Sequence, residues 1–184
     1  MVTAPFPTPP APTPSKPCPD NLIFRPVTDE DLPTIAKLHA RTFGPGRFAR
    51  TAYRIREGAP PVSAHCKVAC IGTRIVAALR FTEVMVGKTA RGLFLGPLVV
   101  DPEYKRQHIG SALITDALAD IDRAGQGFVI LVGDEPYYQR HGFAQTAEGQ
   151  IICPGPVAPH RILIRAAPGK DPAAFCGQLK AVPA

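Results

Sequence analysis

Apolar and polar positions along the chain follow periods that predict both strands and helices. Residues 22–28 alternate between apolar and polar side chains, as in a strand with one buried face. The segment 109–125 carries apolar side chains at four-residue intervals from Ile109 to Ile121, which is typical of a helix with one apolar stripe. A short apolar run at 127–133 follows and indicates a buried strand.

The remaining elements are predicted from similar runs, bounded by Gly and Pro. Helices are predicted over 28–44, 47–58 and 135–142, and strands over 63–71, 74–87, 91–102, 150–153 and 160–167. This order of elements indicates an α+β or α/β domain with a mixed sheet.

The predicted strand 91–102 contains Gly96 and Pro97 in its middle. Proline has no backbone N–H to donate to a neighbouring strand, so it is found at bulges and sheet edges. We therefore expect this strand to be distorted at its centre and to leave backbone groups unpaired nearby.

A chain of 184 residues is long enough for one domain with a real core. Eight of the 22 prolines fall within residues 1–19, and proline fixes φ and lacks a donor, so we expect residues 1–20 to form an extended, disordered arm. The folded domain is predicted over 21–167. Residues 168–184 show no strong pattern and are expected to form a C-terminal tail.

The formal charge of +6 and the sequence pI of about 9.3 suggest an anionic partner. The basic residues are scattered and the chain has no Trp, so we do not expect nucleic-acid binding. No apolar run approaches the roughly 18–20 residues that span a membrane. The five cysteines are odd in number and lack CxxC spacing, which argues against a metal site and favours reduced thiols in a cytoplasmic protein.

A basic turn that includes Lys105 and Arg106 separates the strand 91–102 from the helix that begins near Ile109. One helix joins this strand to the strand at 127–133, so the two strands should be parallel neighbours. A helix N-terminus carries unpaired N–H groups and partial positive charge, and phosphate is its usual ligand. Two interpretations remain open at this point: a phosphate site, or a solvated basic turn that begins a core helix.

Two motifs resemble the GNAT superfamily of N-acetyltransferases. The first is V-D-P-E-Y-K-R-Q-H-I-G-S-A-L, residues 100–113, and the second is Y-Q-R-H-G-F, residues 138–143. They occur in the family's order, separated by one helix and one strand. The resemblance implies the acyl-CoA N-acyltransferase fold, a V-shaped mixed sheet flanked by helices. It also implies acetyl-CoA-dependent transfer of an acetyl group, without a metal, to a primary amine of a small molecule or peptide, and allows a homodimer.

The same resemblance implies roles for individual residues. The backbone of the strand would pair with the pantetheine arm and polarise the thioester carbonyl, and Tyr138 would protonate the leaving thiolate. The implied strand residues are Leu98, Val99 and Val100, and the implied pyrophosphate site comprises Lys105, Arg106, Gln107, His108, Ile109, Gly110 and Ser111.

The chain departs from the family pattern at the pyrophosphate turn, where Lys105 stands for Gln or Arg and His108 for the first glycine. In one interpretation His108 points outward and its N–H still donates. In the other it narrows the site, leaving a catalytically weak or inactive acyl-CoA-binding module. We favour the first, because helical dihedral angles do not require glycine.

The residue that deprotonates the amine is not marked by a motif, because the strand 91–102 lacks the glutamate that many family members carry there. Glu83, Asp101 and His65 remain as possible bases, and a water-mediated relay is also compatible with the sequence. Glu83 is our candidate among them, set against its simpler interpretation as a surface acid. Tyr53 and three arginines lie on the second predicted helix, which often forms a wall of the acceptor site in this family. A solvated cationic face is the simpler interpretation, whereas arginines turned toward the cleft would favour a carboxylate-bearing acceptor; these arginines are Arg50, Arg54 and Arg56.

Overall fold

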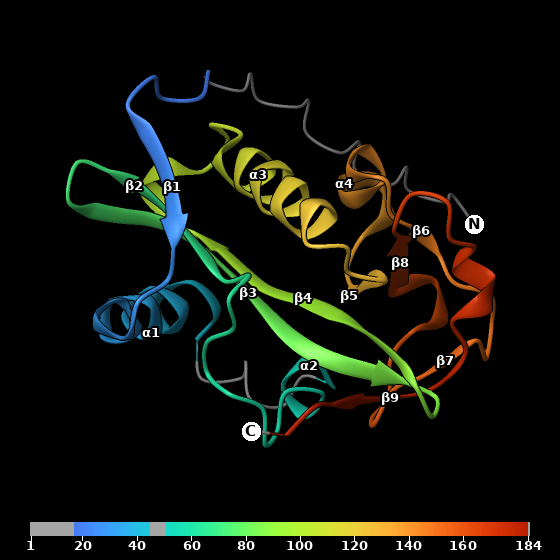
Figure 1. Ribbon diagram of the computed structural model, residues 1–184. Coiled ribbons are helices and arrows are strands. Elements are labelled where there is room, and N and C mark those ends of the chain that lie inside the picture. Colours follow the sequence, from blue (N-terminus) through green and yellow to red (C-terminus); the bar gives the residue numbers. More distant parts are fainter. Residues whose placement is uncertain (1–16, 45–50, 184) are drawn as a thin grey trace, which may run out of the picture.

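A central mixed sheet with helices on both sides makes up this computed structural model, which describes residues 17–44 and 51–183 (Figure 1). The strands are β1 (Leu22–Pro26), β2 (Lys67–Ile71), β3 (Arg74–Val86), β4 (Ala90–Val100), β5 (Phe128–Val132), β6 (Ala144–Gln145), β7 (Ile151–Ile152), β8 (Ile162–Ala166) and β9 (Gly177–Ala181). The helices are α1 (Leu32–Phe43), α2 (Thr51–Arg54), α3 (Ile109–Arg123) and α4 (Glu135–Tyr138). The mixed sheet with flanking helices confirms the predicted fold class.

Two segments differ from the sequence prediction. The helix predicted over 47–58 is the short α2, followed by a turn at residues 55–58, and residues 45–50 lie outside the described part. The tail 168–184, for which no element was expected, contributes β9, which pairs antiparallel with β3 and parallel with β7. The proposed arm falls mostly on residues 1–16, which are outside the described residues.

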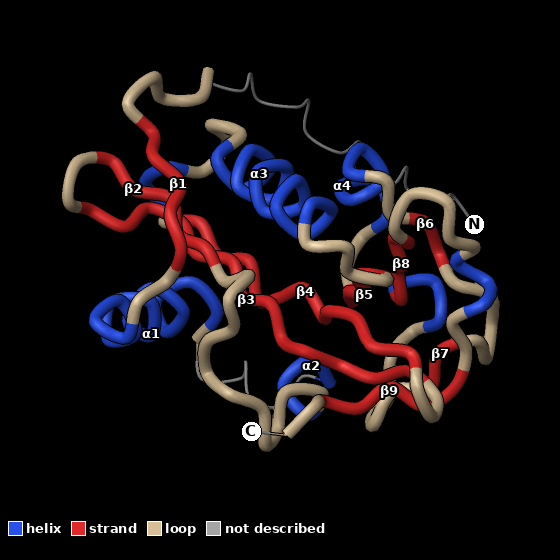
Figure 2. Tube along the Cα trace, viewed as in Figure 1, coloured by secondary structure: helices blue, strands red, loops and turns tan. Residues whose placement is uncertain are grey.

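The sheet opens between β4 and β5. These two strands are parallel, as predicted, but they pair only through Leu93 with Val129 and Phe94 with Ile130. Beyond this point β4 continues beside β3, whereas β5 continues beside β8. The edge of β4 that faces β5 therefore has no strand partner from Leu95 to Val100 among the described residues (Figure 2).

The distortion expected at the centre of β4 is confirmed. Leu79 of β3 pairs with Leu98, but Phe81 pairs with Leu95, so one residue on β3 stands opposite two on β4. This bulge reverses which side chains face each side of the sheet. Leu95 packs in the core under α3 before the bulge, and Leu98 packs there after it, although the two are three residues apart.

Separate hydrophobic clusters cover the two faces of the sheet, with α3 and α4 on one side and α1 and α2 on the other (Figure 1). On the first side, the apolar stripe of α3 that includes Leu113 packs against Phe81 and Leu93. On the other side Leu38 of α1 packs near Val99, and Ile55 packs near Phe94. Within the described residues, no helix combines the length and apolar character needed to cross a membrane.

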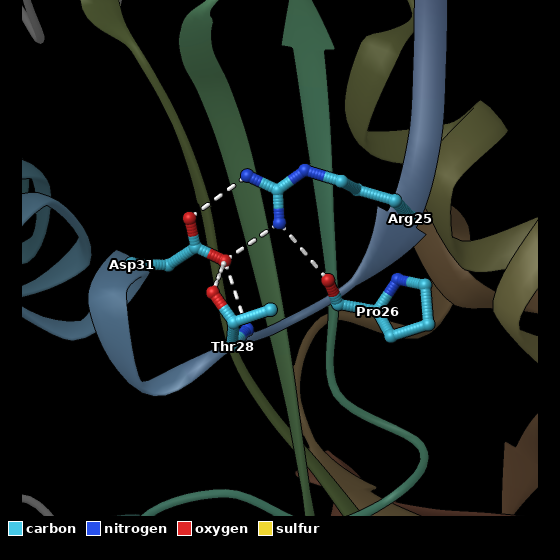
Figure 3. Close-up of polar contacts among 4 residues, drawn as sticks. All are labelled: Arg25, Pro26, Thr28 and Asp31. Carbon is cyan, nitrogen blue, oxygen red and sulfur yellow. Dashed lines mark hydrogen bonds and ion pairs between the residues drawn. The ribbon is translucent and has the colours of Figure 1, made fainter.

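The start of α1 is fixed by Asp31, whose carboxylate is buried beside β1 (Figure 3). Arg25 donates to both carboxylate oxygens, at 2.6 and 2.8 Å, and Thr28 donates through its N–H at 2.9 Å and its hydroxyl at 3.1 Å. These bonds, led by those from Arg25, hold the pKa of Asp31 well below its usual range. The carboxylate therefore ties the first strand to the first helix.

Candidate active site

A cavity of about 740 Å³ lies where β4 separates from β5. Residues 94–98 of β4 form one wall, and Tyr138 of α4 contributes another side. The wall on the α1 and α2 side comes from helix ends and from the loop before β8, namely Phe43, Thr51, Ala52, Tyr53, Arg56, Pro156, Val157, Ala158 and Arg161. The hydroxyl of Thr51 donates to the carbonyl oxygen of Pro156 at 2.7 Å, which holds α2 against that loop.

Tyr138 reaches this cavity because only two residues separate the end of β5 from the start of α4. Its ring makes an edge contact with Tyr137 at 4.9 Å between centroids and another with Phe143 at 5.9 Å. Burial raises the pKa of Tyr138 well above its usual value, and the nearby Arg161 acts in the opposite direction. The phenol is therefore a fully protonated donor at neutral pH.

The N-terminus of α3 is not closed by side chains of its own. His108, the N-cap residue, makes no side-chain capping hydrogen bond, and Lys105, Arg106 and His108 are exposed. The first N–H groups of a helix have no intrahelical acceptor, and the first helical bond here runs from the N–H of Ala112 to the carbonyl of His108. This arrangement offers an anion several backbone donors beside two cationic side chains.

His108 corrects one expectation from the sequence. It adopts a left-handed conformation with φ of 55°, and Arg106 has φ of 63°, whereas we expected His108 to be helical. This conformation favours glycine, which accounts for the glycine of the family pattern at this position. The His108 side chain is exposed, so it does not fill the approach to the helix N-terminus.

Ser111 and Gly110 connect the start of α3 to the segment around α4. The hydroxyl of Ser111 lies 3.1 Å from Nε2 of His141, and a β-carbon at Gly110 would lie 3.0 Å from the hydroxyl of Tyr137. The two motifs found in the sequence are therefore in direct contact. Burial lowers the pKa of His141, which keeps its imidazole neutral at physiological pH.

The three arginines of the second predicted helix differ in their environments. Arg54 is exposed, Arg50 lies outside the described residues, and Arg56 is buried and lines the cavity. The simpler interpretation of a solvated cationic face is therefore wrong for Arg56. Sequence reasoning gave no role to Arg161, which also lines the cavity, because the Pro-rich loop before it carries no periodic pattern.

Glu83 is not brought to the cavity. It is exposed on β3, opposite Leu93, and it does not belong to the cavity lining. The neighbouring His65 has its Nε2 atom 3.3 Å from Nε2 of Gln126, a residue that follows the C-terminus of α3. The described residues that line the cavity include no Asp, Glu or His. No cluster of three potential metal ligands occurs in residues 17–44 and 51–183.

Comparisons with known proteins agree with this geometry. A family model described as an acetyltransferase (GNAT) domain matches residues 24–146. The uncharacterised N-acetyltransferase YhbS of Escherichia coli K12 is 25% identical over 131 residues, which cover 68% of this chain and 75% of that protein.

Two solved structures share the fold. The crystal structure of Escherichia coli YhbS in complex with CoA has a TM-score of 0.72 at 22% identity and covers 95% of this chain and 94% of its own. A GNAT family acetyltransferase from Brucella melitensis in complex with acetyl-CoA has a TM-score of 0.54 at 24% identity, covering 83% of this chain and 97% of its own.

Proposed function

Because this chain belongs to the GNAT family of acetyltransferases, we propose that it moves the acetyl group of acetyl-CoA directly to a primary amine of a small molecule or peptide. The observation that carries the proposal is the open edge of β4, which meets Tyr138 in one cavity. The two similar proteins solved with CoA or acetyl-CoA support the choice of cosubstrate.

The N-terminus of α3 would hold the pyrophosphate of the cosubstrate. Its free backbone N–H groups come from Ile109, Gly110 and Ser111, and the flanking cations and polar groups come from Lys105, Arg106, Gln107 and His108. The unpaired edge at Leu98, Val99 and Val100 would accept the pantetheine arm as an additional half-strand. Such an edge presents backbone donors and acceptors without first breaking a strand pair.

Tyr138 would act as the general acid. As the amine nitrogen bonds to the acetyl carbon and the carbon–sulfur bond breaks, its hydroxyl donates a proton to the thiolate. Arg161 lies near enough to favour a negative charge on the phenolate, which then recovers a proton from solvent. The proton lost by the amine goes to water, since the described cavity lining includes no Asp, Glu or His. Any role of Glu83 as base would require an intervening water.

Calorimetry with acetyl-CoA and with desulfo-CoA tests the binding half of the proposal, and a thiol-release assay over a panel of amines tests transfer. We expect Tyr138→Phe to lower kcat by about 10²-fold or more, the scale of general acid catalysis, while the dissociation constant for acetyl-CoA stays within about threefold. Tyr137→Phe is the matched control, because it removes a neighbouring phenol that does not line the cavity. Binding without thiol release from any amine would instead identify a non-catalytic acyl-CoA-binding module.

A further inference from the structure

Arg56 is a buried cation at the wall of the proposed active site. The residue is only 7% exposed, yet its Nε and Nη1 atoms have no hydrogen-bond partner among the described residues. Its guanidinium carbon lies 4.5 Å from the centroid of the Tyr53 ring, which supports the charge from one side. Buried arginines are normally paired with a carboxylate or fully hydrogen-bonded, so this arrangement calls for an explanation.

No acidic side chain among the described residues forms an ion pair with the Arg56 guanidinium. Arg56 forms no ion pair within the described residues, and the cavity lining there contains no Asp or Glu. Residues 1–16 and 45–50 contain no acid in the sequence either. A second arginine, the half-buried Arg80, adds positive charge, and burial followed by this repulsion lowers the pKa of Arg56 to about 10. Arg56 remains charged at neutral pH and has no counter-ion among residues 17–44 and 51–183.

The other arginine of the cavity differs from Arg56. Arg161 is 45% exposed, and its Nε lies 3.3 Å from a carboxylate oxygen of Asp134. Arg161 therefore already has a counter-ion, the carboxylate of Asp134. The pyrophosphate site proposed at the N-terminus of α3 lies on the opposite side of the sheet from α2 (Figure 1), so the phosphates of the cosubstrate do not account for Arg56.

Building on the proposed function, we propose that Arg56 binds a carboxylate of the acceptor, which is a small primary amine of the amino acid class. A planar guanidinium matches a planar carboxylate, and the pairing is strong where water is excluded. The apolar cavity wall, formed by residues that include Phe43, Phe94 and Val157, fits the side chain of an aliphatic or aromatic amino acid. Tyr138 lines the same cavity, so one bound molecule meets both the carboxylate site and the proposed acid.

The first test compares acceptors that differ only in the carboxylate. Thiol release is measured with L-phenylalanine and L-methionine, with their amides, and with the corresponding decarboxylated amines. We expect kcat/KM to be at least about 100-fold higher for the acids, the scale expected for a buried charge pair. Equal rates for acids and amides would overturn the inference, as would a preference for O-phosphoethanolamine over every acid.

The second test uses Arg56→Gln, with Arg54→Gln as the matched control on the exposed side of α2. Arg56→Gln should raise KM for the acids and remove most of the preference, while rates with amides stay within about threefold. Arg54→Gln should retain the preference. If Arg56→Gln does not fold, the wild-type comparison of acids with amides still tests the inference. Arg56→Lys, which keeps the charge but loses the planar fork, then replaces Arg56→Gln.

A binding measurement separates this inference from the proposed function. Calorimetry of the CoA-loaded protein with L-phenylalanine and with its amide requires no turnover. Binding of the acid alone supports the carboxylate site even if no amine is acetylated, in which case only the proposed transfer fails. Transfer to amides and decarboxylated amines without binding of the acid supports the proposed function and overturns the role of Arg56.

Discussion

The ring of Tyr138 lies so close to Gly133 that a β-carbon at residue 133 would lie 2.4 Å from the Cε2 atom of the tyrosine. Any larger residue must therefore displace the ring or the turn between β5 and α4. We expect Gly133→Ala to lower kcat by about 10-fold or more, a part of the 10²–10⁴-fold that a positioned acid contributes. Steady-state thiol release measures the effect, with circular dichroism to check the fold.

A double-mutant cycle distinguishes this positioning effect from a general loss of structure. If Gly133 acts through Tyr138, then adding Gly133→Ala to Tyr138→Phe should change kcat little further, because the hydroxyl is already absent. Additive losses in the double variant would mean that Gly133 serves the fold or the cosubstrate site instead.

Several features of the site follow from local sequence rules. Gly96 and Pro97 predicted the distorted strand, because a residue without an N–H cannot continue a ladder. The single crossover helix predicted the parallel pairing of β4 with β5. In both cases the determining interactions lie within one element or one turn. The place of Tyr138 was instead implied by the family resemblance of residues 138–143, and Tyr138 lines the cavity.

Other features depend on contacts between distant segments and were missed. Strand β9 carries one fully buried side chain, Leu179, and forms by pairing with β3, so its own sequence shows no period. Arg56 lies beyond the end of α2 at Arg54. A helical period extended through residue 56 therefore placed its side chain on the solvated face, whereas the structure buries it. His108 precedes the first helical residue, and its left-handed backbone is set by the turn rather than by the pattern of α3.

The left-handed backbone of His108 predicts that glycine stabilises this site. A non-glycine residue pays about 1–2 kcal/mol in this conformation, partly offset by the greater freedom of glycine in the unfolded chain. We expect His108→Gly to raise the free energy of unfolding by about 0.5–1 kcal/mol, measured by urea denaturation. His108→Ala is the control, since it removes the imidazole but keeps the β-carbon and the strain. Equal effects of the two variants would show that the imidazole, not the backbone, determines the change.

The position of Glu83 predicts a small effect of its removal. Because its side chain is exposed and outside the cavity lining, Glu83→Gln should leave kcat/KM within about twofold across pH 6–9. The pH dependence should instead follow ionisation of the acceptor amine, rising until its free form predominates. A tenfold or larger loss in Glu83→Gln, together with loss of an acidic limb of the pH profile, would establish Glu83 as a base acting through water.

The carboxylate of Asp31 predicts a pH-dependent contribution to stability. The bonds from Arg25 and Thr28 lower its pKa in the folded state, so its contribution is fully present above the unfolded pKa of about 3.9 and is lost as pH falls through the lower folded value. We expect Asp31→Asn to lower the free energy of unfolding at pH 7 by about 1–3 kcal/mol, with the lower part of that range favoured because Arg25 is 40% exposed. Urea denaturation at pH 7 and at steps below pH 4 should show the wild type and the variant converging in acid.

The matched control is Asp29→Asn, an exposed acid two residues away, which should change stability by less than about 0.5 kcal/mol. A difference between wild type and Asp31→Asn that stays constant down to low pH would mean that packing, rather than the ionised carboxylate, joins β1 to α1.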